Sequence, residues 1–258
     1  MLRSTIALAL ALILPLHAPP ALAATNEAPL PPVVQALQAQ GLTEVHEFQT
    51  GATLRAFAGL IADEPLAVYV TPDGQAFVGT RVGQDGKPLD DDGVKTLTVK
   101  ATSAKTLAQL KQSTWVQDGK TTAPRVIYNF TDPNCPYCHR FWEAARPWVD
   151  AGRVQIRHLL VGVIRDDSPN KAAAILGAPD PSAAFLANET KFGAGGIGPV
   201  KTVPNATQSI LDHNQMLMLS LGFQGTPGIV VVHSDGTLTK FSGLPQGQHL
   251  ERLFGPKP

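Results

Sequence analysis

The chain has 258 residues, 43% of them hydrophobic, and carries 21 acidic and 21 basic side chains. A chain of this size and composition can bury an ordinary core, and its two cysteines are too few for a disulfide-stapled mini-protein. The basic residues form no cluster interleaved with aromatic residues, which argues against a nucleic-acid partner.

Residues 1–23 have the pattern of a secretory signal peptide. Arg3 supplies the positive charge, Ile6 to Leu16 form the apolar core, and Ala21-Leu22-Ala23 is a small-residue cleavage site. This apolar run is too short to span a membrane, and nothing else in the sequence is long and apolar enough. We therefore expect an exported protein without a membrane segment, with 258 − 23 = 235 residues after cleavage.

Residues 24–88 are expected to form a small N-terminal domain. Pro31-Pro32, followed by spaced apolar residues and Gly41, predicts a short amphipathic helix. Apolar runs separated by turn signals predict strands at Leu54–Ile61, Leu66–Thr71 and Gln75–Val82. A small sheet of this kind has open edges, which the pairing of two copies would cover.

Residues 89–118 are expected to link this domain to the rest of the chain. Asp90-Asp91-Asp92-Gly93 marks a polar loop, and Ala101 to Trp115 predicts a partly exposed linker helix with one narrow apolar stripe. The charge changes across this segment. Residues 24–100 carry ten acids and five bases (net −5), whereas residues 101–258 carry eleven acids and fifteen bases (net +4), which supports two domains.

Residues 119–258 have the pattern of a mixed α/β unit. Arg125 to Phe130 reads as a buried strand, and a helix follows that Pro147 should kink and Gly152 should end. Arg153 to Val163 predicts a second strand, parallel to the first. A helical insertion is expected over about 168–222, broken by a glycine-rich connecting loop, before a final hairpin of Ile229–Val232 and Thr237–Phe241.

The two cysteines, Cys135 and Cys138, stand two residues apart where the first of these strands gives way to its helix. At that position the Cys135 sulfur should face unpaired backbone N–H groups and the positive end of the helix dipole. Both favour the thiolate over the thiol. An accessible thiolate of low pKa is what disulfide exchange requires.

Three other functions of the two cysteines must be considered: a structural disulfide, a zinc site and covalent haem attachment. A purely structural disulfide would close so short a loop that it would remove only about 2 kcal/mol of unfolded-chain entropy. Zinc would need further ligands than the adjacent His139 offers, so no metal site is expected. Covalent haem remains an alternative, because Cys135 to His139 satisfies C-x-x-C-H, with Met216 or Met218 as a second axial ligand.

Two segments carry a resemblance to a known family. Phe130 to Cys138, with Gly225-Thr226-Pro227, resembles the active site and cis-proline loop of the thioredoxin superfamily. The stretches Phe141 to Asp150 and Leu159 to Ile164 resemble the periplasmic DsbC/DsbG family more closely. The resemblance covers most of residues 126–253. It implies an α+β protein with an N-terminal cystatin-like dimerisation domain, a linker helix, and a C-terminal thioredoxin fold (119–258) with a helical insertion.

The resemblance also implies the roles of individual residues. Cys135 corresponds to the nucleophile, Cys138 to the resolving thiol, and Pro227 to the cis-proline that holds a substrate segment. Thr226 would hydrogen-bond the thiolate or merely shape the turn. Pro136 and Tyr137 would tune exposure and the helix start. Neighbouring side chains such as His139, Trp142 and Trp148 are expected to serve packing rather than catalysis.

The function expected from the resemblance is that of a periplasmic thiol:disulfide interchange enzyme without a cofactor. It would isomerise wrong disulfides or reduce sulfenylated cysteines in periplasmic proteins, as a homodimer with facing sites. A membrane thiol reductase such as DsbD would supply electrons. The alternative from another class is a dimeric, chaperone-like binding module in which the redox pair is secondary. Neither reading involves nucleic acid or a membrane.

Overall fold

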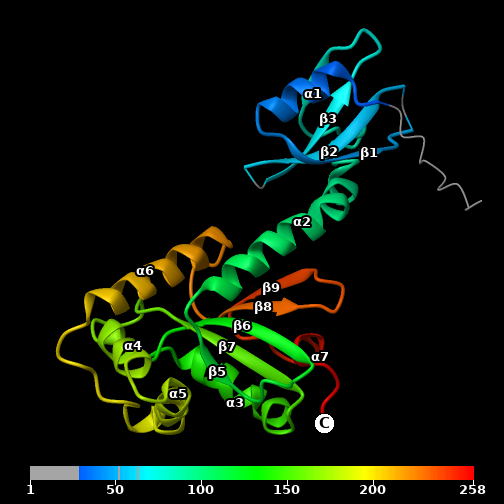
Figure 1. Cartoon of the computed structure of the whole chain (residues 1–258). Helices are drawn as coiled ribbons and strands as arrows, with labels where there is room; N and C mark the ends of the chain where they lie inside the picture. The colour runs from blue at the N-terminus through cyan, green and yellow to red at the C-terminus, as the bar shows by residue number, and fades with distance from the viewer. Residues whose placement is uncertain (1–28, 52, 63) are drawn as a thin grey trace, which may run out of the picture.

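The computed structural model describes residues 29–51, 53–62 and 64–258. The expected signal peptide lies outside these ranges. The described chain forms two sheet-based units joined by one long helix (Figure 1). None of the helices in these ranges is long and apolar enough to cross a membrane.

The N-terminal unit is a four-stranded antiparallel sheet in the order β1-β2-β3-β4, with α1 (Pro32–Ala39) on one face. The strands are β1 (Thr43–Phe48), β2 (Arg55–Ile61), β3 (Glu64–Val70) and β4 (Ala76–Val78). Alternate residues pack on opposite faces, so Phe57 and Val68 meet α1 whereas Ala58 and Tyr69 face the other side. The expected helix and hairpin are confirmed, but β4 is much shorter than the expected strand and β1 was not expected.

Helix α2 (Asp91–Gln112) joins the two units. Its first turn buries Val94 against the N-terminal sheet, and its last turn buries Leu110 in the core of the second unit. The expectation that Asp91 to Gly93 form a loop is therefore wrong, and the helix begins ten residues before Ala101. Two acidic side chains in its first turn suit the positive end of the helix dipole.

The C-terminal unit contains a five-stranded mixed sheet in the order β5-β7-β6-β8-β9. The strands are β5 (Val116–Asp118), β6 (Arg125–Thr131), β7 (Val154–Leu160), β8 (Gly228–Val232) and β9 (Leu238–Ser242). The parallel pairing of β6 with β7 and the antiparallel hairpin β8-β9 are confirmed. Strand β5, at one edge, was not expected.

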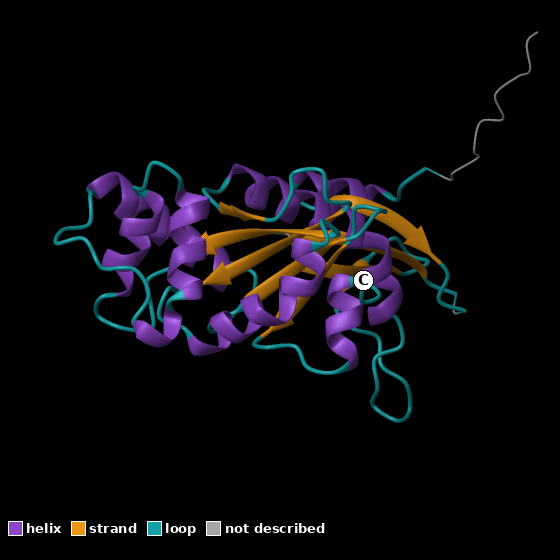
Figure 2. Ribbon diagram, turned by 90° about the horizontal axis from the view of Figure 1, so that it is seen from below, coloured by secondary structure: helices purple, strands orange, loops and turns teal. Residues whose placement is uncertain are grey.

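Helices cover both faces of this sheet (Figure 2). Helices α3 (Pro136–Asp150) and α7 (Gln248–Phe254) pack on one face. The ends of α2 and α6 (Asn205–Ser220) pack on the other. The insertion between β7 and β8 consists of α4 (Ser168–Leu176), α5 (Pro181–Thr190), a short 3-10 turn (Phe192–Ala194) and α6. The expected helical insertion is thus confirmed.

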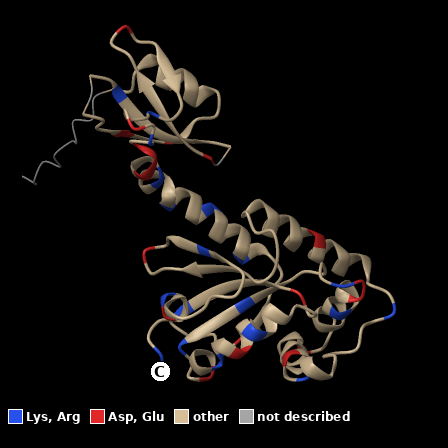
Figure 3. Ribbon diagram, turned by 180° about the vertical axis from the view of Figure 1, so that it is seen from behind, with Lys and Arg blue, Asp and Glu red and all other residues tan. Residues whose placement is uncertain are grey.

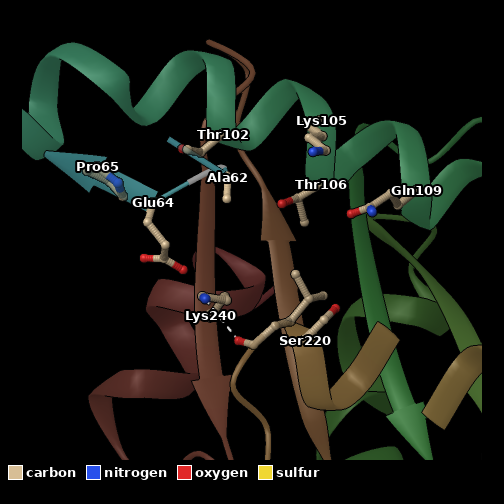
Figure 4. A pocket seen from close by; sticks show the side chains of 10 residues that line it. Ala62, Glu64, Pro65, Thr102, Lys105, Thr106, Gln109, Ser220 and Lys240 are labelled. Atoms are coloured by element: carbon tan, nitrogen blue, oxygen red, sulfur yellow. Dashed lines mark hydrogen bonds between the residues drawn. The ribbon is translucent and has the colours of Figure 1, made fainter. Parts of the chain in front are cut away.

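A cavity of about 420 Å³ lies at the junction of the two units, between the β2-β3 turn, α2 and the end of α6. Figure 4 shows the side chains of Glu64 and Lys240 extending toward one another across it. Lys240 Nζ donates to the carbonyl of Leu221 at 2.9 Å. No residue of the cysteine-bearing loop lines this cavity, so it is separate from the site described next.

Candidate active site

Cys135 occupies the N-cap position of α3, directly after the loop that follows β6. Its backbone is extended (φ −80°, ψ 113°), and its Sγ accepts a hydrogen bond from the backbone N–H of Cys138 at 3.2 Å. A capping side chain normally satisfies one of the free N–H groups of the first turn, and here a sulfur does so. The expected position at the strand-to-helix junction, facing backbone N–H groups, is confirmed.

The surroundings of Cys135 favour its ionised form. A hydrogen bond from the Cys138 thiol lowers the pKa of Cys135 most, burial opposes it, and the Thr226 hydroxyl and backbone N–H groups lower it further, to about 6 from 9.0. At neutral pH a thiol with a pKa of about 6 is roughly nine-tenths thiolate, against roughly one-hundredth at a pKa of 9. Cys135 is therefore charged and nucleophilic under conditions in which an ordinary cysteine is not.

Cys138 has the opposite character. Burial, and then the neighbouring Cys135, raise the pKa of Cys138 well above its ordinary value. Both thiols are free in this structure. One sulfur of the pair is thus set to attack while the other remains protonated, which is the division of roles that two-step disulfide exchange uses.

In this structure the Cys135 sulfur is covered, although disulfide exchange requires an accessible thiolate. Cys135 is only 1% exposed. Its Sγ lies 3.5 Å from the carbonyl oxygen of Thr226, to which the protonated thiol donates, so the loop before Pro227 covers it. The next residues, Pro136 and Tyr137, are exposed, Tyr137 by 56%. Of the Cys135 to Cys138 segment, the two residues between the cysteines are therefore the ones that face solvent.

The loop before β8 brings Thr226 and Pro227 to Cys135 from 91 residues further along the chain. The Thr226-Pro227 peptide bond is cis, as the resemblance implied. Thr226 Oγ1 is buried and has no partner of ordinary hydrogen-bond geometry among the described residues. Its proton is therefore free to turn toward the Cys135 thiolate.

His139, directly after Cys138, is engaged in packing, as expected. Its ring stacks on Phe192 with 4.4 Å between centroids. Its Nδ1 lies 3.0 Å from a carboxylate oxygen of Glu189, a buried residue whose pKa burial raises, and its Nε2 lies 3.5 Å from Glu143. Both ring nitrogens thus face carboxylates. The described residues contain no group of three or more His, Cys, Asp or Glu side chains arranged to hold a metal ion.

A buried polar network behind Cys135 was not expected from the sequence. The carboxylate of Asp132 accepts four hydrogen bonds: Oδ1 from Asn134 N and Ser168 Oγ, and Oδ2 from the backbone N–H groups of Val163 and Ile164, all at 2.7–3.0 Å. These bonds tie the cysteine-bearing loop to the segment after β7 and to α4. They fix the backbone immediately before Cys135, and they place Val163 and Ile164 at the same end of the sheet.

A second part of the network is centred on Asn134, the residue before Cys135. Its amide nitrogen donates to Asp167 at 2.9 Å and to Ser168 at 3.0 Å. Its amide oxygen accepts from Lys171 Nζ at 2.8 Å. In the sequence these residues look like ordinary polar side chains of a helix start, and no pattern in the sequence indicates that they are buried.

Comparisons with known proteins agree with this geometry. A model of the thioredoxin-like domain matches residues 116–255. The thiol:disulfide interchange protein DsbG of Pseudomonas aeruginosa is 38% identical over 235 residues, which cover 91% of this chain and 92% of that protein. DsbG of Escherichia coli is 36% identical over 239 residues, which cover 92% and 96%.

Among solved structures, the catalytic domain of Proteus mirabilis ScsC is similar with a TM-score of 0.49 and 22% identity, covering 60% of this chain and 96% of that one. The assignment rests instead on the two DsbG proteins, because each is more than one-third identical to this chain over an alignment that covers at least 91% of it. The chain belongs to the DsbG family of thiol:disulfide interchange proteins, with a thioredoxin-like C-terminal domain.

Proposed function

We propose that the protein acts in the periplasm as a thiol:disulfide oxidoreductase on misoxidised cysteines of other proteins, with Cys135 as nucleophile and Cys138 as resolving thiol. The observation that carries this proposal is the difference in pKa between the two thiols. Cys135 has a pKa of about 6 at the start of α3, whereas burial keeps Cys138 protonated beside it. A thiolate next to a reserve thiol suits exchange through a mixed disulfide.

The first step forms a bond between Cys135 and a substrate sulfur. The Cys135 thiolate attacks one sulfur of a substrate disulfide, and the other sulfur leaves as a thiolate that takes a proton from water. If that freed thiol attacks another disulfide of the substrate and Cys135 is finally expelled, the substrate has been isomerised with no net transfer of electrons. Pro227 would hold the substrate segment beside Cys135 during this exchange.

The second route reduces the substrate. Cys138 loses its proton and attacks the Cys135 sulfur, which releases the substrate as a thiolate and leaves a Cys135–Cys138 disulfide. The substrate has then gained two electrons and the protein has lost two. A sulfenylated cysteine would enter the same route when Cys135 displaces its hydroxyl as water. A membrane thiol reductase of the DsbD kind would return the two electrons.

Protein substrates are favoured by the apolar surface around the site. Tyr137, Val163 and Ile164 are 56%, 38% and 43% exposed. The parallel strands β6 and β7 end at the same edge of the sheet, so the segment after β7 lies beside Cys135. Exposed apolar side chains next to a reactive thiol suit contact with unfolded or partly folded polypeptide.

We also propose that the protein is a homodimer through its N-terminal sheet. Strand β4 is an edge strand of that sheet, and Phe77 and Val78 on it are 47% and 50% exposed. Val82 and Leu89, in the following loop, are 55% and 52% exposed. An apolar edge of this kind is a template for pairing with a second copy, which would bury both the backbone groups and the side chains.

Trapping tests the catalytic proposal. A Cys138→Ala variant cannot resolve its mixed disulfides, so substrate adducts linked through Cys135 should accumulate in cells and disappear on reduction. A Cys135→Ser, Cys138→Ala protein is the matched control and should trap nothing. Absence of adducts in the single variant would contradict the proposal. Full protection against periplasmic stress by a Cys135→Ser, Cys138→Ser protein would favour the binding-module alternative instead.

A further inference from the structure

A small cavity of about 60 Å³ lies directly beside the cysteine-bearing loop, between that loop, the start of α4 and the 3-10 turn. Its lining residues are Pro133, Asn134, Arg165, Lys171, Phe192 and Gly195. A cavity needs only about 10–15 Å³ on this measure to hold one water molecule, so this one has room for a small polar group. The two charged residues in its wall, Arg165 and Lys171, are both cations.

Lys171 is a buried cation whose hydrogen bonding is incomplete. The residue is 7% exposed, and its ammonium donates to Asn134 Oδ1 at 2.8 Å and to the Gly195 carbonyl at 2.7 Å. An ammonium has three donors, so one is left. Asp167, at 3.9 Å, is too distant for a hydrogen bond, and its side chain is 46% exposed. A buried charge normally has a hydrogen-bonded counter-charge, whereas Lys171 has only this loose ion pair with Asp167.

Arg165 supplies the second cation at the mouth of the cavity. It is exposed, and its guanidinium has no carboxylate within salt-bridge distance in the described parts of the chain. The neighbouring acids Asp166 and Asp167 do not line the cavity, and Asp167 instead accepts from Asn134 at 2.9 Å. The cavity therefore presents a free guanidinium and a spare ammonium donor, and a carboxylate can accept hydrogen bonds from both.

The cavity is also placed to meet a substrate. Pro133 and Asn134 in its wall come directly before Cys135, and consecutive residues of an extended chain are about 3.3–3.6 Å apart. A polypeptide joined to Cys135 through its own cysteine would place an adjacent side chain near this opening. We propose that Arg165 and Lys171 bind an acidic side chain that neighbours the reacting cysteine of the substrate. This inference rests on the proposed function and adds a substrate preference to it.

The test uses the reduced full-length protein and short peptides whose single cysteine carries a coloured thionitrobenzoate leaving group. The peptides are identical except for Glu, Gln or Lys beside the cysteine. Attack by Cys135 forms the peptide mixed disulfide and releases the coloured thiolate, which gives a second-order rate constant. We expect the Glu peptide to react about tenfold faster than the Gln peptide, since a hydrogen bond to a charged group contributes at least that factor.

Variants separate this site from general charge effects. In Arg165→Gln the ratio of the Glu-peptide rate to the Gln-peptide rate should fall toward one. In Arg165→Glu the Lys peptide should become the fastest of the three peptides. Arg153→Gln is the matched control, because Arg153 is also exposed but precedes β7, whereas Arg165 follows it. This control should keep the wild-type ratio, and comparison between variants removes the intrinsic reactivity of each peptide.

The outcomes distinguish this inference from the proposed function. A ratio near one in the wild-type protein, or a ratio that Arg165→Gln leaves unchanged, would overturn the acidic subsite while exchange itself continued. A Cys135→Ser protein that released the coloured thiolate as fast as wild type would overturn the proposed function instead. The preference should also weaken as ionic strength rises, because the Arg165 side of the site is open to solvent.

Discussion

Replacing Asp132 by Asn tests whether the buried network holds the cysteine-bearing loop. The Asp132 carboxylate accepts two hydrogen bonds on each oxygen, from Asn134 N and Ser168 Oγ on one and from Val163 N and Ile164 N on the other. An asparagine keeps one accepting oxygen and puts an NH₂ group in place of the second. Whichever way it is turned, that NH₂ faces two groups that donate in the native protein.

The Ser168 hydroxyl cannot relieve this conflict by reversing its role. Its oxygen already accepts from Asn134 Nδ2 and from Arg165 N, both at 3.0 Å, so its two lone pairs are used. Two donors therefore lose their acceptor in either orientation of the amide: the buried Asn134 N–H and Ser168 hydroxyl in one, and the part-buried Val163 and Ile164 N–H groups in the other. At about 1–3 kcal/mol for each unsatisfied donor, and at the low end of that range for the part-buried pair, Asp132→Asn should lower the free energy of unfolding by about 2 kcal/mol or more.

Chemical denaturation followed by tryptophan fluorescence measures this effect in the relevant domain. All three tryptophans, at positions 115, 142 and 148, lie in the C-terminal part of the chain, so the signal reports that unit and not the N-terminal sheet. Asp212→Asn is the control, because Asp212 is exposed on α6 and, within the described ranges, its side chain accepts a hydrogen bond only from Gln208. It should cost less than about 0.5 kcal/mol. A loss below about 1 kcal/mol in Asp132→Asn would refute this account of the network.

Three further outcomes are expected. Alkylation of Cys135 should speed up as pH rises through about 6 and then level off, because the thiolate is the reacting form. In Cys138→Ala the midpoint of this pH profile should move to higher pH, because the variant lacks the Cys138 hydrogen bond, which is the largest cause of the low pKa of Cys135. An unchanged midpoint would contradict that cause. Thr226→Val should also raise the pKa of Cys135 and slow its alkylation at low pH, and a faster rate there would argue against the hydroxyl. Val78→Lys should shift the protein from dimer to monomer in sedimentation, because it places a charge on the exposed edge strand β4. Leu219→Lys, at an exposed position of α6, is the control and should leave the dimer intact. A wild-type protein that sediments as a monomer at micromolar concentration would refute the proposed dimer.

Local sequence was sufficient to place the reactive cysteine. Pro136 suits the first position of a helix, and apolar residues at Phe141, Ala145 and Trp148 recur at helical spacing. The apolar run before them forms β6, as the pattern predicts. Because these signals act between near neighbours, they locate Cys135 at a helix start, and the low pKa follows from that position and from Cys138 nearby.

Elements whose stability depends on distant partners were missed or misplaced. Strand β1 (Thr43–Phe48) is largely exposed and has few apolar residues, so it exists because β2 pairs with it. The start of α2 at Asp91 reads locally as a polar turn, and packing of Val94 on the N-terminal sheet stabilises it as a helix. In each case a tertiary contact outweighs a weak local preference.

The surroundings of Cys135 were decided by the tertiary structure. Asp132 and Ser168 are 36 residues apart, Asn134 and Lys171 are 37 apart, and Cys135 and Thr226 are 91 apart. The sequence by itself determined which thiol stands at the start of a helix. It did not determine which polar side chains are buried, because a buried network and a solvated surface use the same residue types. Only the packing of the insertion against the sheet removes these groups from water. Once buried, their hydrogen bonds hold the loop before Cys135, and the third donor of Lys171 is left available at the site.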